Sequence, residues 1–182
     1  MKYIIDTETM KVSPYEEKQT TTNETTTPGK SRGVQMVEQL EKWKGSHEWD
    51  GIVSGIQTWF YGFVSKTSWC STTISFLLTG VGIPTRLENV KDLYDFGKKS
   101  GVGRFYTHDD VKIGIPGTIK RGDILFFLWD GDKMETTSKK HVTMCEQDTD
   151  GDMILCIGGN QSDGINPTRY DRKYLYGVWR IE

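Results

Sequence analysis

The apolar residues of this chain change their spacing near Gly101, and this change is the strongest constraint on its fold. Before Gly101 they recur every three or four residues, which is typical of amphipathic helices. After it they form short runs separated by Gly, Asp and Pro, which is typical of strands joined by turns. Helices followed by strands predict an α+β fold, with the helices packed against an antiparallel sheet or small barrel.

Four helices are expected in the first part. Their apolar positions are Met36, Val37, Leu40 and Trp43; Ile52, Ile56, Trp59, Phe60 and Phe63; Cys70, Ile74, Leu77 and Leu78; and Leu87, Val90, Leu93 and Tyr94. The third helix is expected over about residues 68–79, with Thr67 or Ser68 as its N-cap and Gly80 and Gly82 ending it. Strands are expected at residues 111–113, 124–129, 141–146, 153–157 and 174–181.

Residues 1–32 differ from the rest of the chain. A short strand is expected around Tyr3-Ile4-Ile5. Residues 11–32 are rich in Thr and nearly free of apolar side chains, so they cannot bury enough surface to offset the entropy of ordering. We therefore expect a Thr-rich tether there and one folded domain over residues 33–182.

Composition excludes several classes of protein. Of 182 residues 26% are charged, but the net charge is −2, which gives no bulk attraction for nucleic acid. The longest apolar run, residues 124–129, is far shorter than the ~20 residues of a membrane span, so no membrane insertion is expected. The 3 cysteines include no C-x-x-C pair, which argues against a disulfide framework or a zinc ribbon.

Cys70 is the candidate nucleophile. In the first turn of its helix, free backbone N–H groups and the helix dipole favour a thiolate, which is the reactive form of cysteine. Cys70 also lies on the apolar stripe of this helix, so a buried small hydrophobic residue is the alternative interpretation.

A hairpin would bring a histidine and an asparagine together. Asp150-Gly151 between two strand-like runs predicts a two-residue type I′ turn, which places Cys145 opposite Cys156 and His141 opposite Asn160. In Cys-His-Asn enzymes such an amide orients the imidazole. The alternative is an ordinary polar pair, since a loop longer by one residue moves Asn160 to the other face. We expect Cys145 and Cys156 to be reduced core thiols.

Other motifs carry less chemistry. His47 lacks the second histidine of H-E-x-x-H, and His108 is expected in a solvated polar turn. Residues 148–152 (Asp-Thr-Asp-Gly-Asp) bring three carboxylates to one turn but lack the distal Glu of an EF-hand. We therefore expect no metal site and no cofactor.

Three segments resemble the cysteine- and histidine-dependent peptidoglycan hydrolases of the CHAP type. They are Trp69-Cys70-Ser71, residues 121–127 (Arg-Gly-Asp-Ile-Leu-Phe-Phe), and His141-Val142 followed by residues 158–163 (Gly-Gly-Asn-Gln-Ser-Asp). The resemblance covers about residues 33–182 and is closest to compact phage members. Three positions depart from the family pattern: Ser71 and Thr72 follow the cysteine where small apolar residues are common, and Lys140 replaces a glycine before the histidine.

The resemblance implies a papain-like α+β fold, with N-terminal helices on a small antiparallel sheet or half-barrel. It implies Cys70 as nucleophile, His141 as general base and then acid, and Asn160 as the residue that orients His141. Trp69, Trp129 and Gln161 are candidate substrate-binding residues. The reaction implied is hydrolysis of an amide in the peptide part of peptidoglycan, by an N-acetylmuramoyl-L-alanine amidase or an endopeptidase.

The resemblance also implies a biological setting, that of a bacteriophage endolysin. Residues 1–10 lack the basic start and apolar stretch of a secretory signal, so we expect the protein to stay in the host cytoplasm until a holin releases it to the cell wall, or to be carried in a virion. Two alternatives remain open: a papain-like protease or acyltransferase acting on protein, and a wall-binding phage module without catalysis. Sequence does not distinguish amidase from endopeptidase.

Overall fold

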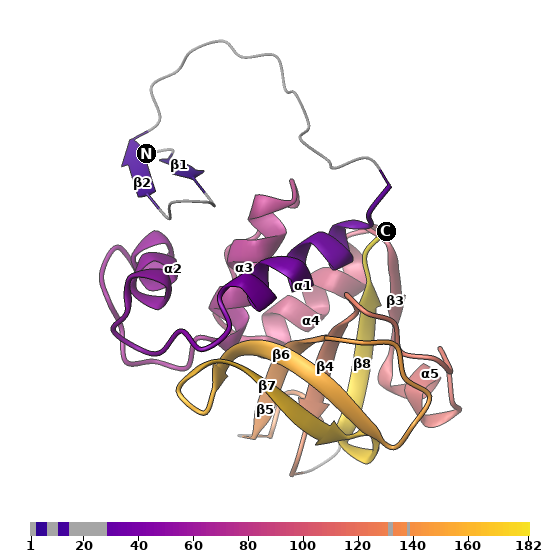
Figure 1. Ribbon diagram of the computed structural model, residues 1–182. Coiled ribbons are helices and arrows are strands. Elements are labelled where there is room, and N and C mark those ends of the chain that lie inside the picture. Colours follow the sequence, from indigo (N-terminus) through magenta and orange to yellow (C-terminus); the bar gives the residue numbers. More distant parts are fainter. Residues whose placement is uncertain (1–2, 7–10, 15–28, 131–132, 138) are drawn as a thin grey trace.

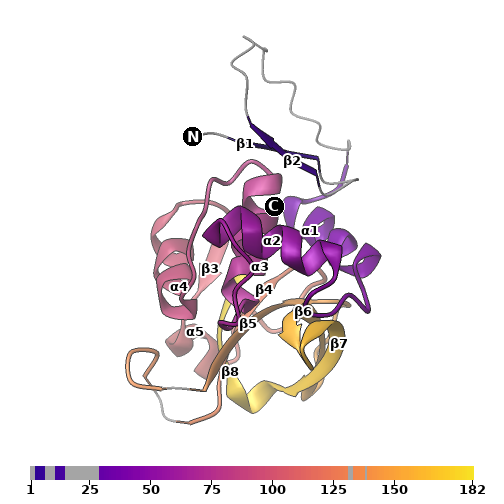
Figure 2. The same ribbon diagram turned by 90° about the vertical axis from the view of Figure 1, so that its left-hand side faces the viewer.

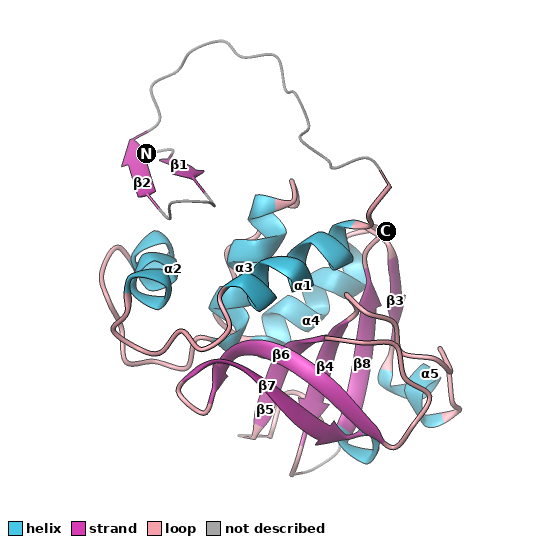
Figure 3. Cartoon of the chain, in the orientation of Figure 1, coloured by secondary structure: helices cyan, strands magenta, loops and turns pink. Residues whose placement is uncertain are grey.

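The computed structural model describes residues 3–6, 11–14, 29–130, 133–137 and 139–182, and helices precede most of the strands (Figures 1 and 3). The helices are α1 (Arg32–Lys42), α2 (Gly51–Tyr61), α3 (Cys70–Gly80), α4 (Val90–Lys99) and α5 (His108–Lys112). The strands are β1 (Tyr3–Asp6), β2 (Lys11–Pro14), β3 (Arg104–Tyr106), β4 (Ile124–Leu128), β5 (Lys140–Cys145), β6 (Met153–Gln161), β7 (Gly164–Asp171) and β8 (Leu175–Arg180). The predicted α+β class is confirmed.

Six strands form one antiparallel sheet in the order β3-β8-β4-β5-β6-β7. Its outer strands, β3 and β7, do not pair with each other, so the sheet is open and not a closed barrel. The strands β1 and β2 form a separate two-stranded sheet.

Both faces of the large sheet are buried, and β4 shows this most clearly. Ile124 and Phe126 belong to the core cluster beneath the helices, whereas Leu125 and Phe127 belong to a second cluster on the opposite face. Successive side chains of a strand point to opposite faces, so an uninterrupted apolar run is what a doubly buried strand requires. Helices α1, α3 and α4 cover the first face, and α3 packs directly on β5 and β6 (Figure 2).

The start of α3 differs from the sequence prediction. Its N-cap is Trp69, which makes no side-chain cap hydrogen bond, so neither Thr67 nor Ser68 is the cap. The Ser68 hydroxyl lies 3.8 Å from the Cys70 sulfur instead. The helix ends at Gly80, as the sequence predicted, and Cys70 is its first residue.

The predicted strand at residues 111–113 is wrong, because the chain forms the short helix α5 there. Thr107 caps this helix in a capping box: its hydroxyl accepts from the Asp110 backbone N–H, and the Asp110 carboxylate accepts from the Thr107 backbone N–H. The signal was present in the sequence as Thr-x-x-Asp. A short apolar pair, Val111 and Ile113, outweighed it in the prediction.

The predicted strands at 124–129, 141–146, 153–157 and 174–181 correspond to β4, β5, β6 and β8, although β6 is longer and continues to Gln161. Strands β3 and β7 were not expected. The first has only 3 residues, and the second contains Pro167, a residue that favours edge positions such as that of β7.

The N-terminal segment contains one correction. The strand at Tyr3–Asp6 was predicted, but Lys11–Pro14 pairs with it as β2, inside the segment predicted to be a tether. The rest of that prediction falls mainly on residues 15–28, which lie outside the described residues. Helix α1 begins at Arg32, close to the predicted start of the domain at residue 33.

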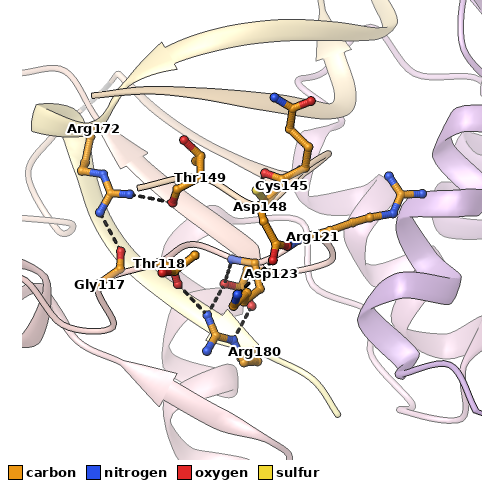
Figure 4. Close-up of polar contacts among 11 residues, drawn as sticks. Gly117, Thr118, Arg121, Asp123, Cys145, Asp148, Thr149, Arg172 and Arg180 are labelled. Carbon is orange, nitrogen blue, oxygen red and sulfur yellow. Dashed lines mark hydrogen bonds and ion pairs between the residues drawn. The ribbon is translucent and has the colours of Figure 1, made fainter. Parts of the chain in front are cut away.

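Two arginine side chains form hydrogen bonds with residues in and around the turn that leads into β4 (Figure 4). The Arg180 guanidinium donates to both carboxylate oxygens of Asp123, at 2.8 and 2.7 Å, and to the carbonyl of Thr118. The Asp123 side chain is only 1% exposed and that of Arg180 is 25% exposed, so the carboxylate is the buried partner of this ion pair. Arg172 similarly binds the carbonyls of Gly117 and Thr149.

Candidate active site

Cys70 begins α3 and is only 3% exposed. Burial raises the pKa of its thiol, but a hydrogen bond with the His141 imidazole and the charge of that ring outweigh this effect. The Val142 backbone N–H and the Ser68 hydroxyl act in the same direction, and the pKa is lowered to about 7. A substantial fraction of thiolate is therefore present at neutral pH.

His141 lies in β5 with a glutamine beside its ring. Its Nε2 is 3.3 Å from Oε1 of Gln161, and the Thr143 hydroxyl donates to the same oxygen at 2.6 Å. Nε2 of Gln161 donates to the carbonyl of Asn166 at 2.6 Å. Because a carbonyl only accepts, this bond fixes the Gln161 amide with its oxygen toward His141. Nε2 of His141 is then the donor, which leaves Nδ1 for the thiol.

The structure therefore corrects the predicted partner of His141. The predicted register holds near the turn, where Cys145 pairs with Cys156 and Met144 with Ile157. Beyond it β6 becomes irregular, with a register shift between Gly158 and Gln161 against β7 and a left-handed φ of 61° at Asn160. A bulge of this kind turns the next side chain to the other face. Gln161 therefore points to His141, while Asn160 donates to the Ser68 hydroxyl at 3.0 Å.

The turn between β5 and β6 also differs from the prediction. Asp150 and Gly151 do not have the positive φ values of a type I′ turn. Thr149 instead exchanges two backbone hydrogen bonds with Ile119, each 2.9 Å long. The connection is thus a wider loop tied to a neighbouring segment, although it preserves the register that the two-residue turn would give.

The candidate substrate-binding residues fall in different environments. Trp69 is fully buried, with its indole N–H bonded to Glu48, so it is a core residue and does not line an open surface. Trp129 is half-buried and lines a cavity next to His141. Gln161 is 3% exposed and lines the same cavity, but its amide is engaged by protein partners.

Two cavities adjoin the Cys70–His141 pair. One, of ≈ 370 Å³, lies on the histidine side and is lined by Ser68, Trp129, Lys139, Lys140, His141, Asn160, Gln161, Ser162, Thr168 and Tyr170. The other, of ≈ 680 Å³, lies on the cysteine side and is lined by Phe60, Ser68, Cys70, Arg86, Leu87, Glu88, Asn89, Val90, Asp92 and Lys140. Ser68 and Lys140 border both cavities, so the two cavities lie on either side of these residues, one next to His141 and the other next to Cys70.

The other two thiols differ from Cys70. Cys145 and Cys156 are free and fully buried. Burial raises the pKa of Cys145 to about 12 and that of Cys156 well above its usual value. These two residues are therefore protonated members of the second core cluster.

The remaining candidate groups lie away from the two cavities. His108 stacks on Tyr176 with ring centroids 4.2 Å apart, so it is not simply solvated, and the backbone of His47 bridges to Gly164. Asp148 accepts from the Arg121 backbone N–H and pairs with Lys120. Among the described residues, no group of three or more His, Cys, Asp or Glu side chains is placed to hold a metal ion.

Sequence reasoning missed three groups around the Cys70–His141 pair: the Ser68 hydroxyl, Thr143 and Tyr170. Thr143 carried a readable signal, because it lies two residues after His141 and so on the same face of its strand. Ser68 was considered only as a helix cap, and Tyr170 lies on the unexpected strand β7.

Fold and site together define an α+β protein in which a buried cysteine at a helix start meets a histidine on an antiparallel sheet, with a cavity on each side of the pair. Comparison with known proteins found no matching family model, no matching curated protein and no matching solved structure. No helix within the described part of the chain is long and apolar enough to cross a membrane.

Proposed function

We propose that this protein is a cysteine amidohydrolase that cleaves an amide bond in the peptide part of peptidoglycan. The observation that carries the proposal is the pairing of Cys70, whose thiol pKa is about 7, with a histidine whose other nitrogen is held by Gln161. A nucleophile–base–amide series of this kind is the working arrangement of Cys-His-Asn hydrolases. The substrate class rests on the CHAP-type resemblance of residues 69–71, 121–127, 141–142 and 158–163.

The arrangement also supports a papain-like fold. A nucleophile at the start of a helix, packed across strands that carry the base and its orienting amide, is the geometry by which papain-like enzymes activate a thiol. In this chain Gln161 takes the orienting role that Asn160 was expected to have.

The reaction proceeds through an acyl-enzyme. His141 Nδ1 takes the proton of the Cys70 thiol, and the resulting thiolate attacks the amide carbonyl carbon. His141 then gives that proton to the leaving amine as the C–N bond breaks, which leaves a thioester. His141 then takes a proton from water, whose oxygen attacks the thioester and releases the acid and the thiolate. The backbone N–H of Cys70, at the open start of α3, is one donor for the oxyanion.

The two cavities provide room on the histidine side and on the cysteine side of the pair. An extended substrate would place its scissile amide near Cys70 and one flanking part in each cavity. This suits an enzyme that cuts within a polymer such as the cell wall. We further propose that the protein serves a bacteriophage as a lysin, released through a holin lesion or carried by the virion.

The test is digestion of purified peptidoglycan from walls of different cross-bridge chemistry, with mass spectrometry of the soluble fragments. We expect clearing by the wild-type protein, none by Cys70→Ala, and fragments that identify the bond as muramoyl-alanine or peptide. Equal clearing by both proteins would reject the proposal. Cleavage of denatured casein without any wall digestion would support the protein-directed alternative instead.

A further inference from the structure

A serine and an asparagine form a polar chain that ends at the nucleophile. Nδ2 of Asn160 donates to Oγ of Ser68 at 3.0 Å, and Oγ of Ser68 lies 3.8 Å from Sγ of Cys70. Ser68 is exposed and borders both cavities next to the Cys70–His141 pair. The reaction proposed above assigns no role to Asn160, and Ser68 has so far appeared only as one of the groups that lower the pKa of Cys70.

The direction of these hydrogen bonds follows from chemistry. The Asn160 amide nitrogen only donates, so Ser68 accepts from it and its own hydroxyl proton stays available. A thiolate has no proton to donate, so in the ionised state the Ser68 hydroxyl must donate to the Cys70 sulfur. A hydrogen bond to the charged form of a group favours that form.

We propose that Ser68 stabilises the Cys70 thiolate and that Asn160 is the positioning residue that holds the Ser68 hydroxyl toward the sulfur. Asn160 thus acts on the cysteine and not on the histidine. The consequence for catalysis rests on the proposed function, whereas the effect on the thiol does not.

The backbone conformation explains why asparagine suits this position. Asn160 has a φ of 61°, in the left-handed region, which asparagine tolerates better than most residues and glycine better still. Asn160→Gly therefore removes the amide without introducing backbone strain. Asn160→Ala would remove the amide and add strain, so it is the less informative variant.

The experiment measures the rate of Cys70 alkylation by iodoacetamide from pH 5 to 9, read by mass spectrometry of the Cys70 peptide. In Ser68→Ala we expect the midpoint to rise by about half a unit to one unit, so that alkylation near pH 6 slows about threefold to tenfold. Ser68→Thr keeps the hydroxyl and should keep the wild-type midpoint. Asn160→Gly should raise the midpoint less than Ser68→Ala does, and the double variant should match Ser68→Ala alone.

The matched control is Ser65→Ala, which removes a hydroxyl from the same loop that bonds Thr67 and not Cys70. Its midpoint should equal that of the wild-type protein. An unchanged or lowered midpoint in Ser68→Ala, or an equal rise in Ser65→Ala, would overturn the inference. Cys145 and Cys156 are buried, so their alkylation in the same digests shows whether a variant has unfolded. If Ser68→Ala does not fold, the midpoint of the folded Ser68→Thr variant tests the inference, because a rise there despite the retained hydroxyl would contradict it.

This measurement separates the inference from the proposed function, because alkylation needs no substrate. A shifted midpoint with no digestion of cell walls by the wild-type protein would support the role of Ser68 and reject the wall substrate. Digestion of cell walls by the wild-type protein together with an unshifted midpoint in Ser68→Ala would support the wall substrate and reject the role of Ser68.

Discussion

Gln161 holds the His141 ring from the side opposite the thiol, with Oε1 of the amide 3.3 Å from Nε2 of the imidazole. The glutamine is itself fixed at both ends, since Thr143 donates to its oxygen and its nitrogen donates to the Asn166 carbonyl. Buried amides held this way have one orientation, and that orientation selects the tautomer of the histidine.

Replacement of Gln161 by Ala should impair catalysis more than it impairs folding. The His141 ring would lose the partner that fixes its tautomer, and we expect kcat for wall digestion to fall about tenfold to a hundredfold. Gln147→Ala removes an exposed glutamine beyond the end of β5 and serves as the control. Equal activity of the Gln161 and Gln147 variants would show that the amide does not orient the base.

The three cysteines should differ sharply in reactivity. The pKa of Cys70 in the folded protein, about 7, lies below the usual value for a thiol. The thiolate fraction of Cys70, and with it the alkylation rate, should therefore rise through neutral pH and fall about tenfold for each pH unit below pH 7. Cys145, with a pKa raised to about 12 by burial, and Cys156 should stay unlabelled in the folded protein. Peptide mapping after brief iodoacetamide treatment at pH 7.5 measures this, and equal labelling of all three would contradict the site.

The same shift links Cys70 to stability. A thiol whose folded pKa is lowered contributes stability that is fully present above its unfolded pKa and is lost as pH falls through the folded value. Relative to Cys70→Ala, the wild-type protein should therefore gain unfolding free energy between about pH 7 and pH 9, at about 1.4 kcal/mol per unit at most. Urea unfolding at pH 6 and pH 9 measures the difference. A larger unfolding free energy of the wild-type protein, relative to Cys70→Ala, at pH 6 than at pH 9 would contradict the lowered pKa of Cys70.

The sequence was sufficient to predict the pairing of β5 with β6 near their connecting loop, but not to predict which residue of β6 faces His141. The two-residue turn predicted at Asp150-Gly151 is not formed, yet the register that it implied is correct, with Cys145 opposite Cys156. The wider loop keeps the same register, which the burial of one strand face requires.

The irregularity near Asn160 lies where β6 meets the segment before α3, with Asn160 at a left-handed φ and bonded to Ser68. Gly158-Gly159-Asn160 was a local signal for a bulge in a strand, and the register prediction did not use it. Because of this irregularity in β6, Gln161 contacts His141 in the place predicted for Asn160, and Asn160 contacts Ser68.

The Gly-Gly pair before Asn160 has a physical reason that the structure supplies. A Cβ on Gly159 would lie 2.7 Å from the buried Trp69 ring and closer still to the Thr73 hydroxyl, so only glycine lets β6 approach the start of α3. Gly159→Ala should destabilise the protein by about 1–3 kcal/mol and should displace the segment that carries Cys70.

The control for this substitution is Gly151→Ala in the exposed loop, where the nearest atom to a new Cβ is the Thr149 hydroxyl at 3.5 Å. Chemical denaturation of both variants measures the difference. A Gly159→Ala variant as stable as Gly151→Ala would mean that β6 and α3 are not in such close contact.

The ion pair between Arg180 and the buried Asp123 carboxylate should matter for stability more than any surface pair. Arg180→Met leaves the nearly buried Asp123 carboxylate without its counter-charge, and we expect a loss of about 3 kcal/mol. Lys120→Ala breaks an ion pair with Asp148 that is about half exposed at both ends, so it should cost less than about 1 kcal/mol. A double variant Arg180→Met with Asp123→Asn should recover part of the loss, and no recovery would contradict the burial argument.

Long-range packing explains the other differences between sequence and structure. The doubly buried strand β4 was readable because its apolar run has no interruption. The strand β7 was not, because Pro167 argues against a strand until the position of β7 at the edge of the sheet is known. Short elements such as β3 depend on partners far along the chain, here β8.

The most direct test of the central claim is to count new free amino groups and new reducing ends in purified cell walls after incubation with the protein. Amide hydrolysis by Cys70 predicts that amino groups increase with time, that reducing ends do not, and that Cys70→Ala produces neither. Reducing ends without amino groups, or equal release of amino groups by Cys70→Ala, would contradict the account.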